Sequence, residues 1–171
     1  SFNQVVRVPG RNAAIVADSQ GALWLYEVDN KALNPLIDFN ASLVDFAVSP
    51  DGHVILAALK NEIRYVDLND PAQVLFTHVF ERDIVSVDFS LDGRLFLVCQ
   101  EFQATLWDIQ TLSVVHPIED TSVLITDANF SGDGKSVLLS YENGVTKKLE
   151  IDSPRLLIVS GGISPTDQLV E

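Results

Sequence analysis

The chain has 171 residues, of which 47% are apolar and 20% charged, and its net charge is −13 at pH 7. Such a chain can bury one sizeable core, so a single domain over 1–171 is expected, and it is too apolar to be disordered. The longest unbroken apolar run, 54–59, is far shorter than the roughly 18 residues of a membrane span. Because no basic cluster exceeds Lys147-Lys148, the sequence favours neither nucleic acid nor a membrane as a partner.

The sulfur-containing residues bear on the cell compartment and on the extent of the chain. Cys99 is the single cysteine, so no internal disulfide can form, and a reducing, cytoplasmic location is expected. The chain has no methionine and begins with Ser1, which favours a fragment of a longer protein. Residues 1–8 alternate in polarity and do not resemble a signal peptide.

A turn motif recurs along the chain, from Ser49 to Ser90 and from Ser90 to Ser131, at a spacing of 41 residues in each case. Its three copies are Ser49-Pro50-Asp51-Gly52, Ser90-Leu91-Asp92-Gly93 and Ser131-Gly132-Asp133-Gly134. Asp-Gly predicts a tight turn, because glycine accepts positive φ and aspartate bonds to nearby backbone groups. We therefore expect the three aspartates to be structural turn residues that bind no ligand.

Apolar segments surround each turn in a pattern that is typical of β-hairpins. The expected hairpin strands are 43–48 and 54–58, 84–89 and 95–99, and 125–130 and 137–141. Third strands end at Asp67, Asp108 and Glu150, and short fourth strands are expected at 74–76, 113–115 and 156–160. The first 41 residues fit the same frame, with a turn at Val8-Pro9-Gly10-Arg11 and strands at 13–17, 23–28 and 35–39. The sequence thus predicts an all-β fold of four repeated units, each a sheet of four antiparallel strands.

The third strands end in similar residue pairs. Trp107-Asp108 is the one Trp-Asp dipeptide at this position, and Tyr26-Glu27, Val66-Asp67 and Leu149-Glu150 occupy the same place. These strand ends resemble those of WD-repeat β-propellers. The resemblance covers nearly the whole chain and implies four propeller blades, at about 1–41, 42–82, 83–123 and 124–163. Residues 164–171 are then a tail or the start of a next blade. Since WD-repeat propellers usually have seven or eight blades, we expect this chain to be part of such a ring.

The chain also departs from the family pattern. No Gly-His pair precedes the first strands, and the position of the family aspartate is held by Gln20, Lys60, Glu101 and Asn143. The buried hydrogen-bonded tetrad of the family is therefore not expected, and the blades must be held together by apolar packing between sheets. Trp107 should lie buried between adjacent blades. The two outer faces should meet other blades, from a longer chain or from a second copy of this one.

Residues that could carry chemistry are sparse. His53, His78 and His116 lack partners at metal-ligand spacing, and we expect them in surface loops. Gly161 to Pro165 lacks the second glycine of a nucleophile elbow, and 127–138 ends in Leu138 where a calcium loop needs a glutamate. The sequence therefore predicts no catalytic residue, no metal ligand and no cofactor, so this segment is not expected to be an enzyme.

The family resemblance implies a protein–protein interaction scaffold that binds through loops on one propeller face. The loop positions that face partners in the family correspond here to Ser19, Ser42, Asp83, Gln100, Leu124 and Glu142. Acidic residues dominate nearby, so the expected partner is a protein with a basic or polar segment. An alternative is an accessory or gating propeller of a larger enzyme, such as a prolyl-type peptidase.

Overall fold

The computed structural model describes residues 2–119, 123–152 and 156–160. Within these ranges the chain forms four antiparallel sheets, each of four strands that are hydrogen-bonded in chain order. The expectation of an all-β protein of four repeated four-stranded units is therefore confirmed. The prediction that 164–171 is a tail or the start of another unit lies outside the described residues.

The strands have similar lengths in all four sheets. Sheet A contains β1 (Phe2–Arg7), β2 (Ala13–Asp18), β3 (Ala22–Glu27) and β4 (Ala32–Asp38). Sheet B contains β5 (Leu43–Val48), β6 (Val54–Leu59), β7 (Glu62–Asp67) and β8 (Val74–Val79). Sheet C contains β9 (Ile84–Phe89), β10 (Leu95–Gln100), β11 (Gln103–Asp108) and β12 (Ser113–Glu119). Sheet D contains β13 (Ile125–Phe130), β14 (Ser136–Tyr141), β15 (Thr146–Glu150) and β16 (Leu156–Ser160).

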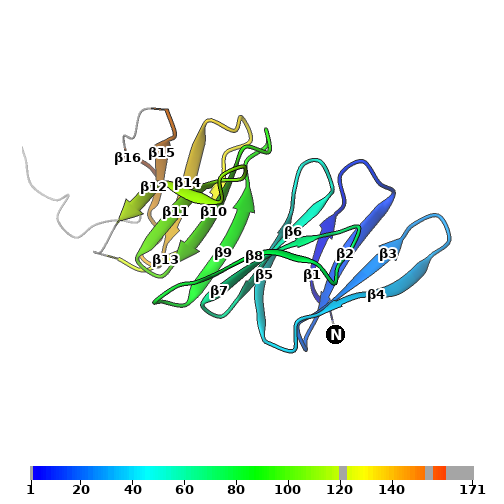
Figure 1. Ribbon diagram of the computed structural model, residues 1–171. Coiled ribbons are helices and arrows are strands. Elements are labelled where there is room, and N and C mark those ends of the chain that lie inside the picture. The colour runs from blue at the N-terminus through cyan, green and yellow to red at the C-terminus, as the bar shows by residue number, and fades with distance from the viewer. Residues whose placement is uncertain (1, 120–122, 153–155, 161–171) are drawn as a thin grey trace, which may run out of the picture.

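The four sheets follow one another in chain order across the molecule, from sheet A in blue to sheet D in yellow and orange (Figure 1). Their first strands contact one another in sequence, β1 with β5, β5 with β9 and β9 with β13. We call these four strands the inner strands. Three buried apolar clusters fill the spaces between sheets A and B, B and C, and C and D. The expected apolar packing between sheets is thus confirmed.

The Asp-Gly turns are built as their sequence predicts. Gly52, Gly93 and Gly134 have φ of 73°, 69° and 69°, in the left-handed region that favours glycine. In the first of these turns, the Asp51 carboxylate accepts hydrogen bonds from the Ser49 hydroxyl and the His53 amide, at 2.5 and 3.0 Å. Asp92 and Asp133 make the same two bonds in their own turns. The role of all three aspartates as turn residues is confirmed.

The first hairpin turn has the same length but a different conformation. Val8 N donates to Ala13 O at 3.0 Å, as Ser49 N donates to Val54 O at 2.9 Å, so the hairpins are equivalent. The positive φ falls on Gly10, at 72°, one position earlier in the turn than in the other sheets. Glycine at the third turn position after proline is the pattern of a type II turn. The hairpin length is therefore conserved although the Ser-x-Asp-Gly motif is not.

Strand pairing aligns the third strands as the sequence predicts. Glu27, Asp67, Asp108 and Glu150 each pair with the first residue of the second strand in their own sheet. The residue before each acid is Tyr26, Val66, Trp107 and Leu149 in turn. Trp107 is only 4% exposed and lies in the apolar cluster between sheets B and C, with its ring 4.9 Å from that of His78. The predicted burial of Trp107 between adjacent sheets is confirmed.

No helix in the described part of the chain has the length and apolarity needed to span a membrane.

Candidate functional site

The sheets carry two sets of loops at opposite ends. The hairpin turns near residues 8–11, 49–52, 90–93 and 131–134 form one end together with the described residues between third and fourth strands, 28–31, 68–73, 109–112 and 151–152, and we call it the turn end. The loops between second and third strands and the connections between sheets form the other, which we call the connection end. Its described residues are 19–21, 39–42, 60–61, 80–83, 101–102, 123–124 and 142–145. All six predicted partner-binding residues lie at or beside this end.

Backbone hydrogen bonds tie the loops of the connection end to the next sheet. Lys60 O accepts from Ile84 N at 2.6 Å, and Glu101 O accepts from Ile125 N at 2.7 Å. In both cases a loop of one sheet holds the first residue of the next inner strand. Because these bonds use main-chain groups, the loop side chains are left available for other contacts. The connection end is therefore a set of loops held in fixed positions on a β scaffold.

The structure brings some of the predicted residues together. Ser19 and Ser42 line one shallow cavity, with Asp18 and Asn40. Glu142 N donates to Leu124 O at 3.0 Å, so these two also lie side by side. Asp83 is exposed in the connection between sheets B and C. The prediction that these residues contact a partner stays a prediction.

Gln100 differs from the other five predicted residues because it is buried, with 4% exposure. Its side-chain amide donates to Arg82 O at 3.1 Å, across the connection that precedes β9. This bond fixes the connection in place. The side chain of Gln100 therefore supports the loops and is not part of their exposed surface.

Asp18 gives the first loop of the connection end its shape. Its carboxylate accepts from the Trp24 indole at 2.9 Å and from the backbone amides of Gln20 and Ala22. The Trp24 bond, followed by that of Gln20, holds the pKa of Asp18 below its ordinary value. The Trp107 indole donates instead to the Thr105 hydroxyl at 2.9 Å. Each of the two tryptophans thus has a polar partner in its own sheet.

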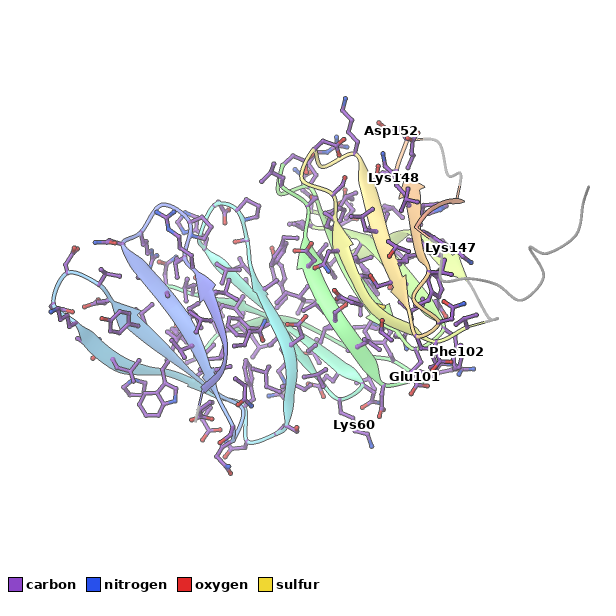
Figure 2. All side chains as sticks on the ribbon, turned by 180° about the vertical axis from the view of Figure 1, so that it is seen from behind. Lys60, Glu101, Phe102, Lys147, Lys148 and Asp152 are labelled. Atoms are coloured by element: carbon purple, nitrogen blue, oxygen red, sulfur yellow. The ribbon has the colours of Figure 1, made fainter. Side chains whose placement is uncertain are left out.

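Acidic side chains outnumber basic ones at the connection end. Glu81, Asp83, Glu101 and Glu142 are all exposed there, beside the basic Lys60 and Arg82. Figure 2 shows Lys60, Glu101 and Phe102 at the same end of the molecule. The Arg82 guanidinium lies over the Phe102 ring, 5.5 Å from its centroid, so this cation is held against an aromatic side chain. The surface that remains is predominantly negative.

Sequence reasoning missed a series of polar contacts between the inner strands. Gln4 donates to Phe46 O at 3.2 Å, Asp45 accepts from Val87 N at 2.9 Å, and Ser86 accepts from Ala128 N at 3.0 Å. Each bond joins residue i to the backbone of residue i+42 on the next inner strand. We call this series the inner-strand ladder. Its signal in the sequence was a polar residue every 41 positions, Gln4, Asp45, Ser86 and Asp127, within otherwise apolar strands.

Strand irregularities place the ladder residues. The pairing of every inner strand with its second strand shifts at the residue before the ladder position, as between Leu43 and Asp45 or Ile125 and Asp127. Such a bulge bends a strand and redirects a side chain. The ladder is therefore built from a local irregularity that is repeated in all four sheets.

Two carboxylates of the inner strands are largely removed from water. Burial raises the pKa of Asp45 and of Asp88, and backbone hydrogen bonds from Val87 and Phe130 offset part of that effect. The Asp88 carboxylate accepts from Phe130 N at 2.8 Å, which adds a second contact between β9 and β13. These groups link the sheets through the backbone, so their geometry indicates a structural role.

Cys99 and the three histidines are the other residues whose chemistry the sequence raised. Burial raises the pKa of the Cys99 thiol to about 12, so this group is not a thiolate nucleophile near neutral pH. Among the described residues there is no group of three or more His, Cys, Asp or Glu side chains that could hold a metal ion. The expected loop position holds for His53 alone, because His78 lies in β8 and His116 in β12.

No protein-family model matches this chain. A search of curated proteins likewise finds no relative. The architecture of repeated antiparallel sheets therefore rests on the structure itself, and the WD-repeat resemblance rests on the residues that carry it.

Proposed function

We propose that the chain is a WD-repeat β-propeller segment that serves as a protein–protein interaction scaffold and binds its partner through the connection end. The repeated four-stranded sheets and the aligned third strands support the propeller assignment. In this proposal each sheet is a blade, and further blades complete a ring of seven or eight.

The observation that carries the binding proposal is the contrast between the two ends. At the turn end, Asp51, Asp92 and Asp133 each bond within their own turn. At the connection end, main-chain bonds and the buried or loop-bonded side chains of Gln100 and Asp18 hold the loops, while the acidic side chains of Asp83, Glu101 and Glu142 are exposed. Fixed loops with exposed charge form a pre-organised surface, which lowers the entropy lost on binding.

The charge of this surface defines the partner class. Glu101, Glu142 and Asp83 come from three separate segments of the connection end and are all exposed. Together they favour a segment rich in lysine or arginine, because complementary charge speeds association and opposes acidic partners. The proposed ligand is therefore a basic segment of another protein.

The test uses a lysine-rich peptide and a glutamate-rich peptide of the same length, with binding followed by fluorescence anisotropy. We expect the basic peptide to bind and its affinity to fall as salt is raised. A triple variant, Asp83→Asn, Glu101→Gln and Glu142→Gln, should lose most of this binding. The charge-matched control Asp29→Asn, Asp70→Asn and Asp152→Asn alters exposed acids at the turn end. Equal losses in both variants would indicate attraction by net charge alone and would reject the connection end as the site.

A further inference from the structure

Each sheet has one edge at its inner strand and the other at its fourth strand. The fourth strands are β4, β8, β12 and β16, and within the described residues each is paired only with the third strand of its own sheet. The main-chain groups that point away from the third strand therefore have no neighbouring strand. Proteins commonly protect such an edge with proline, charge or a bulge, because an unprotected edge accepts a further strand.

Proline protects the same position of the edge in sheets A and C. The position is the fourth-strand partner of the third-strand residue that lies three places before the terminal acid. It is held by Pro35 in β4, Thr77 in β8 and Pro117 in β12. All three strands carry a register shift, so the proline is what distinguishes sheets A and C from sheet B. In sheet D the position is held by Ile158 of β16, most of whose side chains lie outside the described residues.

The N–H of Thr77 points away from β7. Phe80 N donates to Asn61 O at 2.8 Å, directly after the last pair between β7 and β8. In an antiparallel pair, residues that exchange main-chain hydrogen bonds alternate with residues whose main-chain groups face outward. Every second residue counted back from Phe80 therefore bonds to β7, and Thr77 and Val79 direct their N–H and C=O groups to the open edge. Proline at this position would remove one of these outward donors.

The side chains of β8 suit a neighbouring strand on both faces. β8 contains no Asp, Glu, Lys or Arg, whereas β4 and β12 contain one acidic residue each. Phe76 and His78 face sheet C, with their ring centroids 6.0 and 4.9 Å from that of Trp107. Thr77 and Val79 point to the opposite face and are exposed, Val79 by 60%. Alternating apolar and β-branched side chains would therefore find cross-strand partners along β8.

Charge differs between the two ends of β8. Asp67 and Asp70 lie at its start, where Asp67 N donates to Gln73 O, and the basic residue nearby, Arg11, donates to Asn69 Oδ1 at 2.6 Å. The residues around the other end are balanced in charge, namely Lys60, Glu81, Arg82 and Asp83, with the Glu62–Arg64 ion pair on β7. A basic residue is therefore favoured at the start of β8 only. A second copy of the chain is disfavoured as the neighbour, because each copy carries a net charge of −13.

We propose that β8 binds an extended segment of another protein as a fifth, antiparallel strand of sheet B. The outward N–H and C=O groups of Thr77 and Val79 bond to the main chain of that segment, which is how sheet edges recognise peptides. Its side chains alternate between apolar and β-branched residues, and lysine or arginine at its C-terminal end meets Asp67 and Asp70. This surface goes beyond the proposed function, since it lies on the strand edge and not on the loops of the connection end.

The test uses a short peptide of alternating valine and threonine with lysines at its C-terminal end. Its control has the same sequence with the central main-chain amides methylated, so that it keeps the charge but loses the donors. Binding is followed by fluorescence anisotropy, and amide exchange by nuclear magnetic resonance. We expect the first peptide to bind and to protect the amides of Thr77 and Val79 from exchange, and the methylated peptide not to bind.

Two variants of the edge should each weaken this binding by at least about tenfold. Thr77→Pro removes an outward N–H without removing a bond to β7, and it gives sheet B the residue that sheets A and C carry. Val79→Lys places a charge on the edge, which opposes strand pairing, at a side chain exposed enough for the fold to be kept. The matched control Thr77→Val retains the N–H and should bind as the unmodified chain does. Asp70→Asn should weaken binding at low salt only.

Three results would overturn the proposal. Unchanged binding to both edge variants, or protection of amides other than those of Thr77 and Val79, would exclude β8 as the site. Equal binding of the two peptides would show that side chains, and not main-chain bonds, hold them. Self-association that Thr77→Pro abolishes, measured by sedimentation equilibrium, would make a second copy the occupant. Thr77→Pro should leave binding of the lysine-rich peptide at the connection end unchanged, so failure of this proposal is distinguishable from failure of the proposed function.

Discussion

Asp51, Asp92 and Asp133 lie in the hairpin turns, whereas Asp45 and Asp88 lie in the inner strands. The turn aspartates bond to groups two residues away, and these bonds, mainly from the turn serine and amide, leave the pKa of each lowered. The inner-strand aspartates bond to a backbone amide 42 residues away, and burial leaves the pKa of each raised. The comparison shows that an aspartate that bonds within its own turn keeps its charge in contact with water, whereas an aspartate that bonds to the next sheet is largely buried.

The largest expected effect concerns a side chain that lies between sheets. Trp107→Ala should lower the free energy of unfolding by about 3–5 kcal/mol, because it leaves a cavity between sheets B and C. Trp24 is the matched control, since it is only half-buried and lies on the outer face of sheet A. Trp24→Ala should cost clearly less in a denaturant titration at a concentration where the chain is monomeric. Similar losses for the two variants would mean that contacts between sheets do not dominate stability.

The second prediction compares Gly93, where only the turn conformation requires glycine, with Gly52, where a side chain would also collide with the neighbouring sheet. Gly93→Ala should cost about 1–2 kcal/mol, because alanine disfavours the positive φ of this turn. At Gly52 a Cβ would in addition lie 2.4 Å from Pro9 O of the first hairpin, whereas at Gly93 the nearest atom is Pro50 Cδ at 3.9 Å. Gly52→Ala should therefore destabilise the chain more than Gly93→Ala. Equal shifts in the denaturation midpoint would show that the contact between turns adds nothing to stability.

The smallest effect is the dependence of stability on pH, and it has opposite signs in the two regions. The raised pKa of Asp45 and Asp88 means that their contribution is full below the ordinary value of 3.8 and is lost as pH rises through the raised pKa. The lowered pKa of Asp51 and Asp92 means that their contribution is present above 3.8 and is lost as pH falls through the lowered pKa.

Two variants test these signs by denaturant titrations between pH 3 and pH 7. Relative to the unmodified chain, Asp45→Asn should gain stability as pH rises, because it removes a buried charge. Asp92→Asn should lose stability relative to the unmodified chain over the same rise. The same direction in both variants would contradict the difference between turn and inner-strand aspartates.

The repeated sheets could be predicted because their signals are local. Each Ser-x-Asp-Gly motif specifies a turn through its own side chains, and the alternation on either side specifies the strands that pair across it. The position shared by Tyr26, Val66, Trp107 and Leu149 could also be predicted, since an acid follows each of them and the register preserves it. The first turn was predicted in position but not in conformation, because moving one glycine changes the turn type without changing its length.

The candidate site was predictable only in outline. The repeat predicts where the loops lie, but Asp83, Leu124 and Glu142 were singled out among loop residues by the WD-repeat resemblance and not by spacing. Gln100 has the same loop spacing but is buried against the Arg82 carbonyl, and nothing near it in the sequence distinguishes it from an exposed residue. The sequence shows that Asp45 and Ser86 are polar residues in apolar strands. Their hydrogen bonds to Val87 and Ala128 could not be predicted, because these bonds depend on which strand lies beside them.

The sequence by itself therefore determined the strands, the turns, the period and the alignment of the third strands, because each depends on residues close together in the chain. The tertiary structure alone decided the inner-strand ladder and the burial of Gln100. Those features depend on groups far apart in the chain that meet only when the sheets pack. A polar residue in a strand has the same conformational preference whether its side chain faces water or the backbone of another strand. Only the packing of the sheets decides which of the two it faces.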